Sequence, residues 1–189
     1  MAAVESQMLE LGTLAPSFTL PDPDGEMHSL SAGAPAYLVM FICNHCPYVK
    51  HVREELARIG NDYGPRGVAI YAINSNDVEN YPGDAPDKMM KEAETWGYTF
   101  PYLVDESQDV AKAYKAACTP DIYVFDGDRR LVYRGQLDDS RPGNSEPVDG
   151  HDLRAAVDAV LAGGTVSELQ IPSIGCNIKW KPGNAPGYG

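Results

Sequence analysis

The sequence has few basic residues and no long hydrophobic segment. Its 15 lysines and arginines are outnumbered by 27 aspartates and glutamates, so the formal net charge is −12. This charge repels phosphate groups and argues against a protein that binds nucleic acid or anionic membranes electrostatically. The longest apolar run has seven residues, whereas a membrane-spanning helix needs about 20. We therefore expect partners that are neither nucleic acids nor membranes.

Several sequence signatures are also missing. The first residues lack the basic and apolar segments of a secretory signal peptide, so we expect a cytoplasmic protein whose thiols are kept reduced. There is no glycine-rich phosphate-binding loop, and we expect no cofactor. A metal site is the main competing chemistry for the cysteines, but distant segments would have to converge, because a second C-x-x-C motif is absent. We expect no bound metal.

The most informative feature is a pair of cysteines at the end of an apolar run. Residues 36–42 predict a buried strand, and Cys43 and Cys46 follow it with C-x-x-C spacing. Pro47 then opens an amphipathic helix that we expect to end at Gly60. A helix N-terminus carries a partial positive charge and free N–H donors, and both stabilise a thiolate. We therefore interpret Cys46 as a redox nucleophile.

Cys43 is the natural resolving thiol for Cys46. A disulfide requires Cα atoms about 4.4–6.8 Å apart, whereas a continuous strand would hold residues i and i+3 about 10 Å apart. Asn44 and His45 must therefore turn, and asparagine suits a turn. His45 and Lys50 are also the candidate cations beside the thiolate. The alternative is that Cys43 is only a small buried residue at a strand end.

The rest of the chain alternates between predicted strands and helices. Strands are predicted at 17–20, 26–30, 68–73, 101–104, 122–126 and 131–135, and helices at 86–96, 108–116 and 151–162. This order indicates an α/β fold with a largely parallel central sheet, to which a closing hairpin adds antiparallel edges. We expect a loosely held arm over residues 1–14 and no regular element from Pro172 onward.

Three segments give the chain a family resemblance. Residues 12–22 resemble the start of redoxin domains, and residues 44–50 and 175–181 resemble signatures of a peroxiredoxin-like subgroup. The chain is thereby identified as a member of the thioredoxin-like superfamily, on the peroxiredoxin-related branch that includes alkyl hydroperoxide reductase-type proteins. The resemblance implies a single thioredoxin-like domain over residues 1–189, with a central mixed sheet flanked by helices, an N-terminal β-hairpin extension, a core over about 12–162 and an irregular C-terminal tail over about 163–189.

The resemblance also bears on the reaction. Cys46 matches the nucleophile of thioredoxins, but Val49 stands where their resolving cysteine lies. Cys43 occupies the position of the peroxide-binding threonine of peroxiredoxins. Thr119-Pro120 resembles the cis-proline loop of thioredoxins and stands in the region of the peroxide-activating arginine of peroxiredoxins. The resemblance therefore favours dithiol–disulfide exchange over efficient peroxidase chemistry.

Two further cysteines have open roles. If Pro120 is cis, as the resemblance implies, its loop packs beside Cys46 and its backbone can pair with a substrate strand. Cys118 would then lie near the pair, either as a third redox thiol or as a core cysteine. Cys176 is either an alternative resolving thiol or a residue that packs beside Trp180 in the tail.

We predict a thiol–disulfide oxidoreductase in which Cys46 attacks a substrate disulfide, Cys43 resolves the mixed disulfide and a thiol reductant system restores the dithiol. The alternatives are a thiol peroxidase, in which a hydroperoxide oxidises Cys46 to a sulfenic acid, and a non-enzymatic redox sensor. The predicted substrates are protein or small-molecule disulfides or hydroperoxides, in keeping with an antioxidant role. The residues expected near the site are Pro47, His45, Thr119, Pro120 and Cys118, with Cys176 as a candidate additional thiol.

Overall fold

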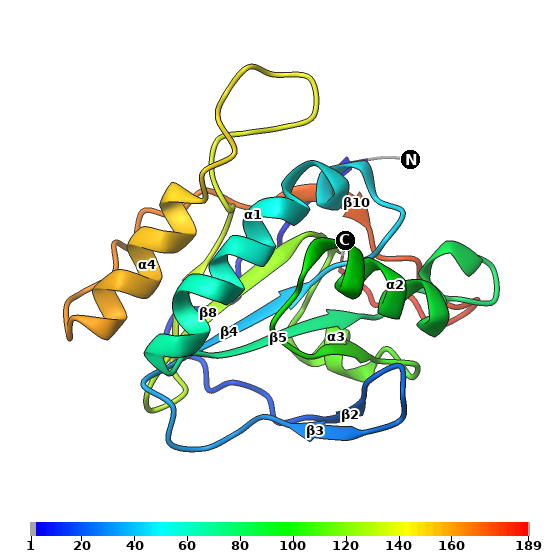
Figure 1. The fold of residues 1–189 in the computed structure, drawn as a ribbon, viewed down its shortest axis with the longest axis horizontal. Coiled ribbons are helices and arrows are strands. Elements are labelled where there is room, and N and C mark those ends of the chain that lie inside the picture. The colour runs from blue at the N-terminus through cyan, green and yellow to red at the C-terminus, as the bar shows by residue number, and fades with distance from the viewer. Residues whose placement is uncertain (1–2, 189) are drawn as a thin grey trace.

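The computed structural model describes residues 3–188. Its centre is a five-stranded sheet with the strand order β6-β5-β4-β8-β9 (Figure 1). Strands β4, β5 and β6 are parallel, while β8 runs antiparallel to both β4 and β9. The mixed sheet of the predicted α/β fold is thus confirmed. Its strands are β4 (Ala36–Phe41), β5 (Ala69–Asn74), β6 (Tyr102–Val104), β8 (Asp121–Asp126) and β9 (Leu131–Arg134).

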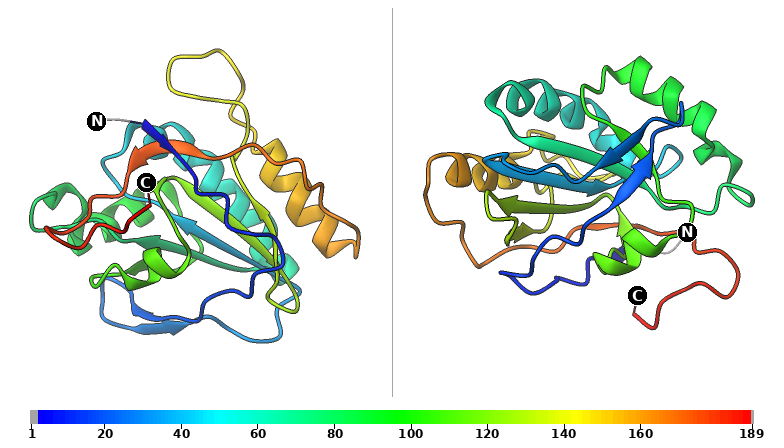
Figure 2. Two further views of the ribbon diagram at one scale, coloured as in Figure 1. Left: turned by 180° about the vertical axis from the view of Figure 1, so that it is seen from behind. Right: turned by 90° about the horizontal axis from the view of Figure 1, so that it is seen from below.

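Both faces of this sheet are covered (Figure 2). One core joins the sheet to α1 (Pro47–Tyr63), α2 (Pro86–Trp96) and α4 (His151–Leu161). The other core joins it to α3 (Asp109–Ala113) and to the hairpin of β2 (Thr19–Pro21) and β3 (Met27–Ser29). Two short 3-10 helices, η1 (Gly64–Arg66) and η2 (Pro82–Asp84), follow α1 and precede α2. Among residues 3–188, none of the helices combines the length and the apolar character needed to span a bilayer.

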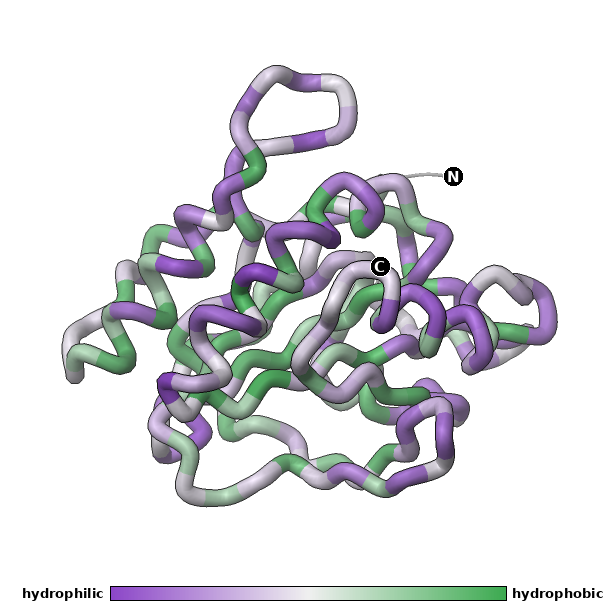
Figure 3. Tube along the Cα trace, in the orientation of Figure 1, coloured by the Kyte–Doolittle hydropathy of each residue, from purple (hydrophilic) through white to green (hydrophobic). Residues whose placement is uncertain are grey.

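The apolar runs of the sequence form the central strands because each strand is buried on both sides. In β4, Leu38 and Met40 belong to the core under α1, whereas Tyr37, Val39 and Phe41 belong to the opposite core. This alternation follows from the two-residue period of a strand. In Figure 3 the central strands of the sheet are coloured mostly as hydrophobic residues. Strands flanked on both faces therefore read as continuous apolar runs.

Helix α1 is longer than the sequence predicts. Its predicted apolar face is buried, but the helix continues past Gly60 to Tyr63. Gly60 itself is buried, and a Cβ atom there would lie 2.8 Å from both the Phe100 ring and the Thr99 hydroxyl oxygen. This glycine therefore allows close packing of the helix against residues 99–100 and does not end it.

Both ends of the described chain are more ordered than predicted. The segment expected to be irregular from Pro172 onward contains strand β10 (Ile174–Asn177), and the arm expected to be loose contains strand β1 (Ala3–Glu5). A second sheet with the order β1-β10-β7 joins them to β7 (Cys118–Thr119). In the rear view of Figure 2, β10 in orange lies beside β1 in dark blue. Cross-strand hydrogen bonds, which propensity alone does not reveal, order these segments.

Candidate active site

Cys46 lies at the junction that the sequence indicates, between the end of β4 and the first residue of α1. Its side chain is fully buried, with 0 % of its surface exposed. The Sγ atom lies 3.2 Å from the carbonyl oxygen of Thr119, in the residue before Pro120. The peptide bond between Thr119 and Pro120 is cis, as the family resemblance implied. Pro47 is exposed at the start of the helix.

Cys43 lies beside Cys46 on the opposite side of a short bend. It is also buried, and its Sγ atom lies 3.4 Å from the hydroxyl oxygen of Thr119. The Cys43 thiol is the group that most strongly lowers the pKa of Cys46. Asn44 and His45 form the bend between the two cysteines, as their sequence predicts. All four cysteines are free thiols.

The two neighbouring thiols have opposite acidities. The hydrogen bond from Cys43 is the main cause that lowers the pKa of Cys46 to about 4, and donors from Cys176, the Val49 backbone and Thr119 add to it. Burial opposes this lowering. The Thr119 carbonyl oxygen accepts a hydrogen bond from Cys46 only when the thiol is protonated. The hydrogen bond between the two cysteines, followed by burial, raises the pKa of Cys43 well above its usual value. At neutral pH the pair therefore consists of a Cys46 thiolate and a Cys43 thiol.

The groups that stabilise this thiolate most strongly are uncharged hydrogen-bond donors. The sequence had instead led us to expect a neighbouring cation, His45 or Lys50. The Nδ1 atom of His45 lies 2.5 Å from a carboxylate oxygen of Asp84, and its ring stacks on Tyr81 with centroids 5.7 Å apart. Lys50 is exposed on the outer face of α1. The largest contributions to the low pKa of Cys46 come from hydrogen bonds instead.

Asp84 holds the bend between the cysteines in place, and the sequence reasoning missed it. This carboxylate is fully buried and accepts hydrogen bonds from the backbone N–H groups of Asn44 and His45, at 2.8 and 3.2 Å. The side-chain amide of Asn76 donates to its second oxygen at 2.8 Å. In the sequence Asp84 lies in a Pro- and Gly-rich connection about 40 residues away, where an aspartate reads as an ordinary turn residue.

Three side chains at the bend between the two cysteines are of types that can bind a metal ion. Ligand atoms of Cys43, His45 and Asp84 all lie within 4.8 Å of one another. Both carboxylate oxygens of Asp84, however, already accept hydrogen bonds from the bend and from Asn76. These contacts favour a role for Asp84 in positioning the two thiols.

Cys176 also reaches the site, although it lies 130 residues further along the chain. It belongs to β10 and stands directly opposite Thr119 in the antiparallel pairing with β7. Its thiol is one of the groups that lower the pKa of Cys46. Burial and then this hydrogen bond raise the pKa of Cys176 to about 12. The sequence left open a role as an additional thiol or as a residue that packs beside Trp180. Cys176 belongs to the core under α1, whereas Trp180 packs against the opposite core, so the structure favours the role at the site.

Cys118 has a different environment. It is fully buried in β7, and its thiol faces two carbonyl oxygens, that of Pro120 at 3.5 Å and that of Ser173 at 4.0 Å. Burial raises its pKa well above the usual value. This setting favours the core-cysteine interpretation over that of a third redox thiol.

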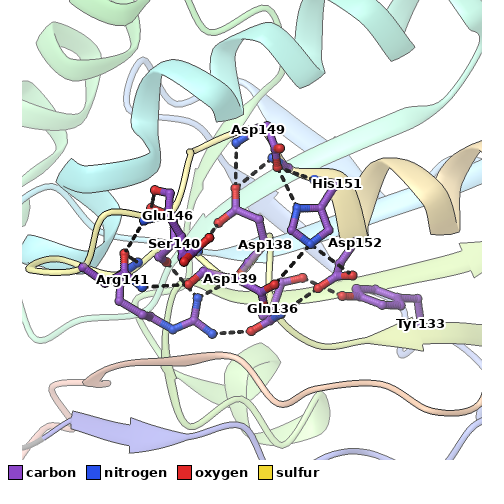
Figure 4. A network of polar contacts seen from close by, with 12 residues as sticks. Tyr133, Gln136, Asp138, Asp139, Ser140, Arg141, Glu146, Asp149, His151 and Asp152 are labelled. Carbon is purple, nitrogen blue, oxygen red and sulfur yellow. Dashed lines mark hydrogen bonds and ion pairs between the residues drawn. The ribbon is translucent and has the colours of Figure 1, made fainter.

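A small cavity opens beside Pro120, between α1, the segment before β10 and residues 136–142. Its lining includes Tyr48, His51, Pro120, Gln136 and Ile174. The adjoining loop over residues 138–150 is closed at its neck by Asp138, which accepts hydrogen bonds from the backbone N–H groups of residues 140, 149 and 150 (Figure 4). Its volume of about 20 Å³ has room for roughly one water-sized molecule next to the Thr119–Pro120 peptide.

Comparisons with known proteins agree with this architecture. The sequence matches the AhpC/TSA family over residues 11–134. It is 30% identical over 139 residues to the thiol-disulfide oxidoreductase ResA of Geobacillus kaustophilus (strain HTA426), which covers 70% of this chain and 74% of the relative. A crystal structure of an uncharacterized conserved protein from Geobacillus kaustophilus is 60% identical, with a TM-score of 0.94 over 96% of this chain and 98% of that one.

A more distant structure shows the fold. The thioredoxin domain of a thiol-disulfide oxidoreductase from Bacteroides vulgatus superposes with a TM-score of 0.56 at 22% identity, over 67% of this chain and 88% of that chain. The chain therefore belongs to the AhpC/TSA family and is an oxidoreductase with a thioredoxin-like fold.

Proposed function

We propose that the protein catalyses thiol–disulfide exchange, with Cys46 as the nucleophile and Cys43 as the resolving thiol. The observation that carries this proposal is the adjacent pair of thiols with opposite acidities. Exchange proceeds through a thiolate, and Cys46 is ionised at neutral pH. The similarity to a relative named as a thiol-disulfide oxidoreductase supports the same reaction.

The proposed reaction has two steps. In the first step, the Cys46 thiolate attacks one sulfur of a substrate disulfide, forms a mixed disulfide and releases the other substrate sulfur as a thiolate. In the second step, Cys43 loses its proton, attacks the Cys46 sulfur and releases the remaining substrate thiolate. The two protein thiols have then lost two electrons, which the substrate disulfide has gained. A thiol reductant restores the dithiol by the reverse exchange.

The acidity of Cys43 is suited to this order of events. Its thiol proton is held by the Cys46 thiolate, which is the main cause of its raised pKa. Once Cys46 is bound in a mixed disulfide, that negative charge is gone and Cys43 ionises more readily. Cys43 therefore stays inactive until the mixed disulfide has formed.

A second candidate function is reduction of hydroperoxides. The complete burial of Cys46 favours a small oxidant over a bulky one. Thr119, whose carbonyl oxygen lies 3.2 Å from the Cys46 Sγ atom, precedes Pro120, which lines the small cavity. A hydroperoxide would oxidise the Cys46 thiolate to a sulfenic acid and leave as an alcohol, after which Cys43 would form the disulfide and release water.

One set of assays tests both candidates. Reduced protein is mixed with glutathione disulfide, with insulin or with a hydroperoxide, and turnover is followed with a thiol reductant present. We expect Cys46→Ser to abolish turnover and Cys118→Ser, a matched buried thiol, to retain it. Equal turnover in wild type and Cys46→Ser with every oxidant would refute the proposal. Reaction with the hydroperoxide alone would favour the second candidate.

A further inference from the structure

Strand β10 lies across the active site along the edge of β7. Its pairing with β7 is antiparallel, with Cys176 opposite Thr119 and Asn177 opposite Cys118. From the Thr119–Pro120 loop, the sequence predicted a backbone edge that pairs with a substrate strand. In the structure the chain's own strand β10 fills this edge, and β1 pairs with the far side of β10.

The approach of β10 to the site is unusually close. A Cβ atom on Gly175 would lie 2.0 Å from the carbonyl oxygen of Thr119, a distance that real Cβ atoms do not tolerate. The same carbonyl oxygen lies 3.2 Å from the Sγ atom of Cys46. Glycine at position 175 thus allows the strand to lie directly against the residue that contacts the nucleophile.

Hydrogen bonds on both sides fix the position of Cys176. Before it, the backbone N–H of Ser6 donates to the Ser173 carbonyl at 2.9 Å. After it, the backbone N–H of Lys179 donates to the Asn76 side chain at 2.8 Å, and the Lys179 carbonyl accepts from the Asp77 backbone at 2.8 Å. The segment that carries the thiol is therefore held at the site by bonds that do not involve the thiol itself.

We propose that β10 occupies the place of a substrate strand and that Cys176 is a second resolving thiol for Cys46. This proposal rests on the proposed function, because it concerns the second step of the same exchange. Cys43 and Cys176 approach Cys46 from different segments. Cys43 lies across the bend from it, and Cys176 lies opposite Thr119, whose carbonyl oxygen is 3.2 Å from the Cys46 Sγ atom. Either one can therefore attack a mixed disulfide formed there.

A substrate disulfide first leaves one of its halves bound to the Cys46 sulfur. Cys176 then loses its proton to solvent, its sulfur bonds to the Cys46 sulfur, and the bond from Cys46 to the substrate breaks. The substrate half leaves as a thiolate with the electron pair and takes up a proton. The product is an intramolecular Cys46–Cys176 disulfide in the position that a bound substrate strand would take.

The experiment uses the full chain and glutathione disulfide as the probe. Reduced wild type, Cys43→Ser, Cys176→Ser and the double variant are each treated with one equivalent, quenched with acid and alkylated. Non-reducing peptide mapping by mass spectrometry then identifies every disulfide and every alkylated thiol. Cys43→Ser combined with Cys118→Ser is the matched control, and circular dichroism verifies that each variant is folded. If a serine variant does not fold, alanine takes its place.

We expect Cys43→Ser to release both halves of glutathione and to form the Cys46–Cys176 disulfide, with or without Cys118→Ser. The double variant should retain glutathione on Cys46. A Cys43→Ser protein that keeps glutathione on Cys46 and has Cys176 alkylated would overturn the proposal while leaving the first step of exchange intact. If the double variant acquires no glutathione, the nucleophile itself is wrong, and both proposals fall.

Discussion

Replacing Cys43 by alanine should make the Cys46 thiol less acidic. The pKa of Cys46 is about 4, against about 8.5 for an unperturbed cysteine, and this difference corresponds to about 6 kcal/mol of thiolate stabilisation. The Cys43 hydrogen bond is the largest favourable contribution. A hydrogen bond to a charged group contributes about 1.5–3 kcal/mol, so its loss should raise the pKa by about 1 to 2 pH units.

The ultraviolet absorbance of the thiolate, measured as a function of pH, reports this pKa directly. The Cys46→Ser protein supplies the background, and subtracting it isolates the titration of Cys46. Cys43→Ser retains a hydroxyl donor and should shift the midpoint less than Cys43→Ala does. A midpoint that is the same in wild type and Cys43→Ala would refute the idea that the partner thiol stabilises the thiolate. Equal shifts in the serine and alanine variants would refute the role of the hydrogen bond.

Three further predictions concern packing and buried charge. Gly60→Ala should lower the free energy of unfolding, measured in urea, by about 1–3 kcal/mol, because the new methyl group overlaps the Phe100 ring. A rise of about 0.5–1 kcal/mol, which is usual when alanine replaces glycine inside a helix, would contradict this packing argument. Asp84→Ala should cost about 3–5 kcal/mol in the same assay, because it removes the buried acceptor of the bend; a loss below about 1 kcal/mol, the size of one ordinary hydrogen bond, would contradict that role. Burial raises the pKa of Asp121 to about 6, so this carboxyl favours the folded state at low pH and loses that contribution between about pH 4 and pH 6. As the pH rises through this range, the free energy of unfolding of the wild type should therefore fall relative to that of Asp121→Asn by up to about 3 kcal/mol. A pH-independent difference between the two proteins would refute the raised pKa of Asp121.

The features that the sequence predicted correctly are local ones. An uninterrupted apolar run predicts a buried strand, and β4 and β5 lie at the residues that these runs indicate. Helix α2 begins at Pro86, and Gly97 follows its last residue in a left-handed conformation. In each case a few neighbouring residues carry the physical cause, so a single sequence contains the information.

The features that the sequence missed depend on distant partners. Gly60 reads as a helix end because its packing against Phe100 is not encoded nearby. Asp84 reads as a turn residue because its acceptor role is defined by Asn44 and His45, about 40 residues earlier. The order of β1 and β10 likewise comes from pairing between the two ends of the described chain.

The same distinction bears on the chemistry of the C-x-x-C pair. The motif alone identifies two thiols and a helix start, but the Cys46 sulfur contacts groups from three separate segments, at Cys43, Thr119 and Cys176. Thr119 is held between the nucleophile and β10, so any movement of that strand also alters the surroundings of the thiolate. Such a movement would remove the Cys176 donor and open the β7 edge together. The acidity of Cys46 and its access to a substrate strand are therefore coupled through one backbone position, which the spacing of the two motif cysteines does not encode.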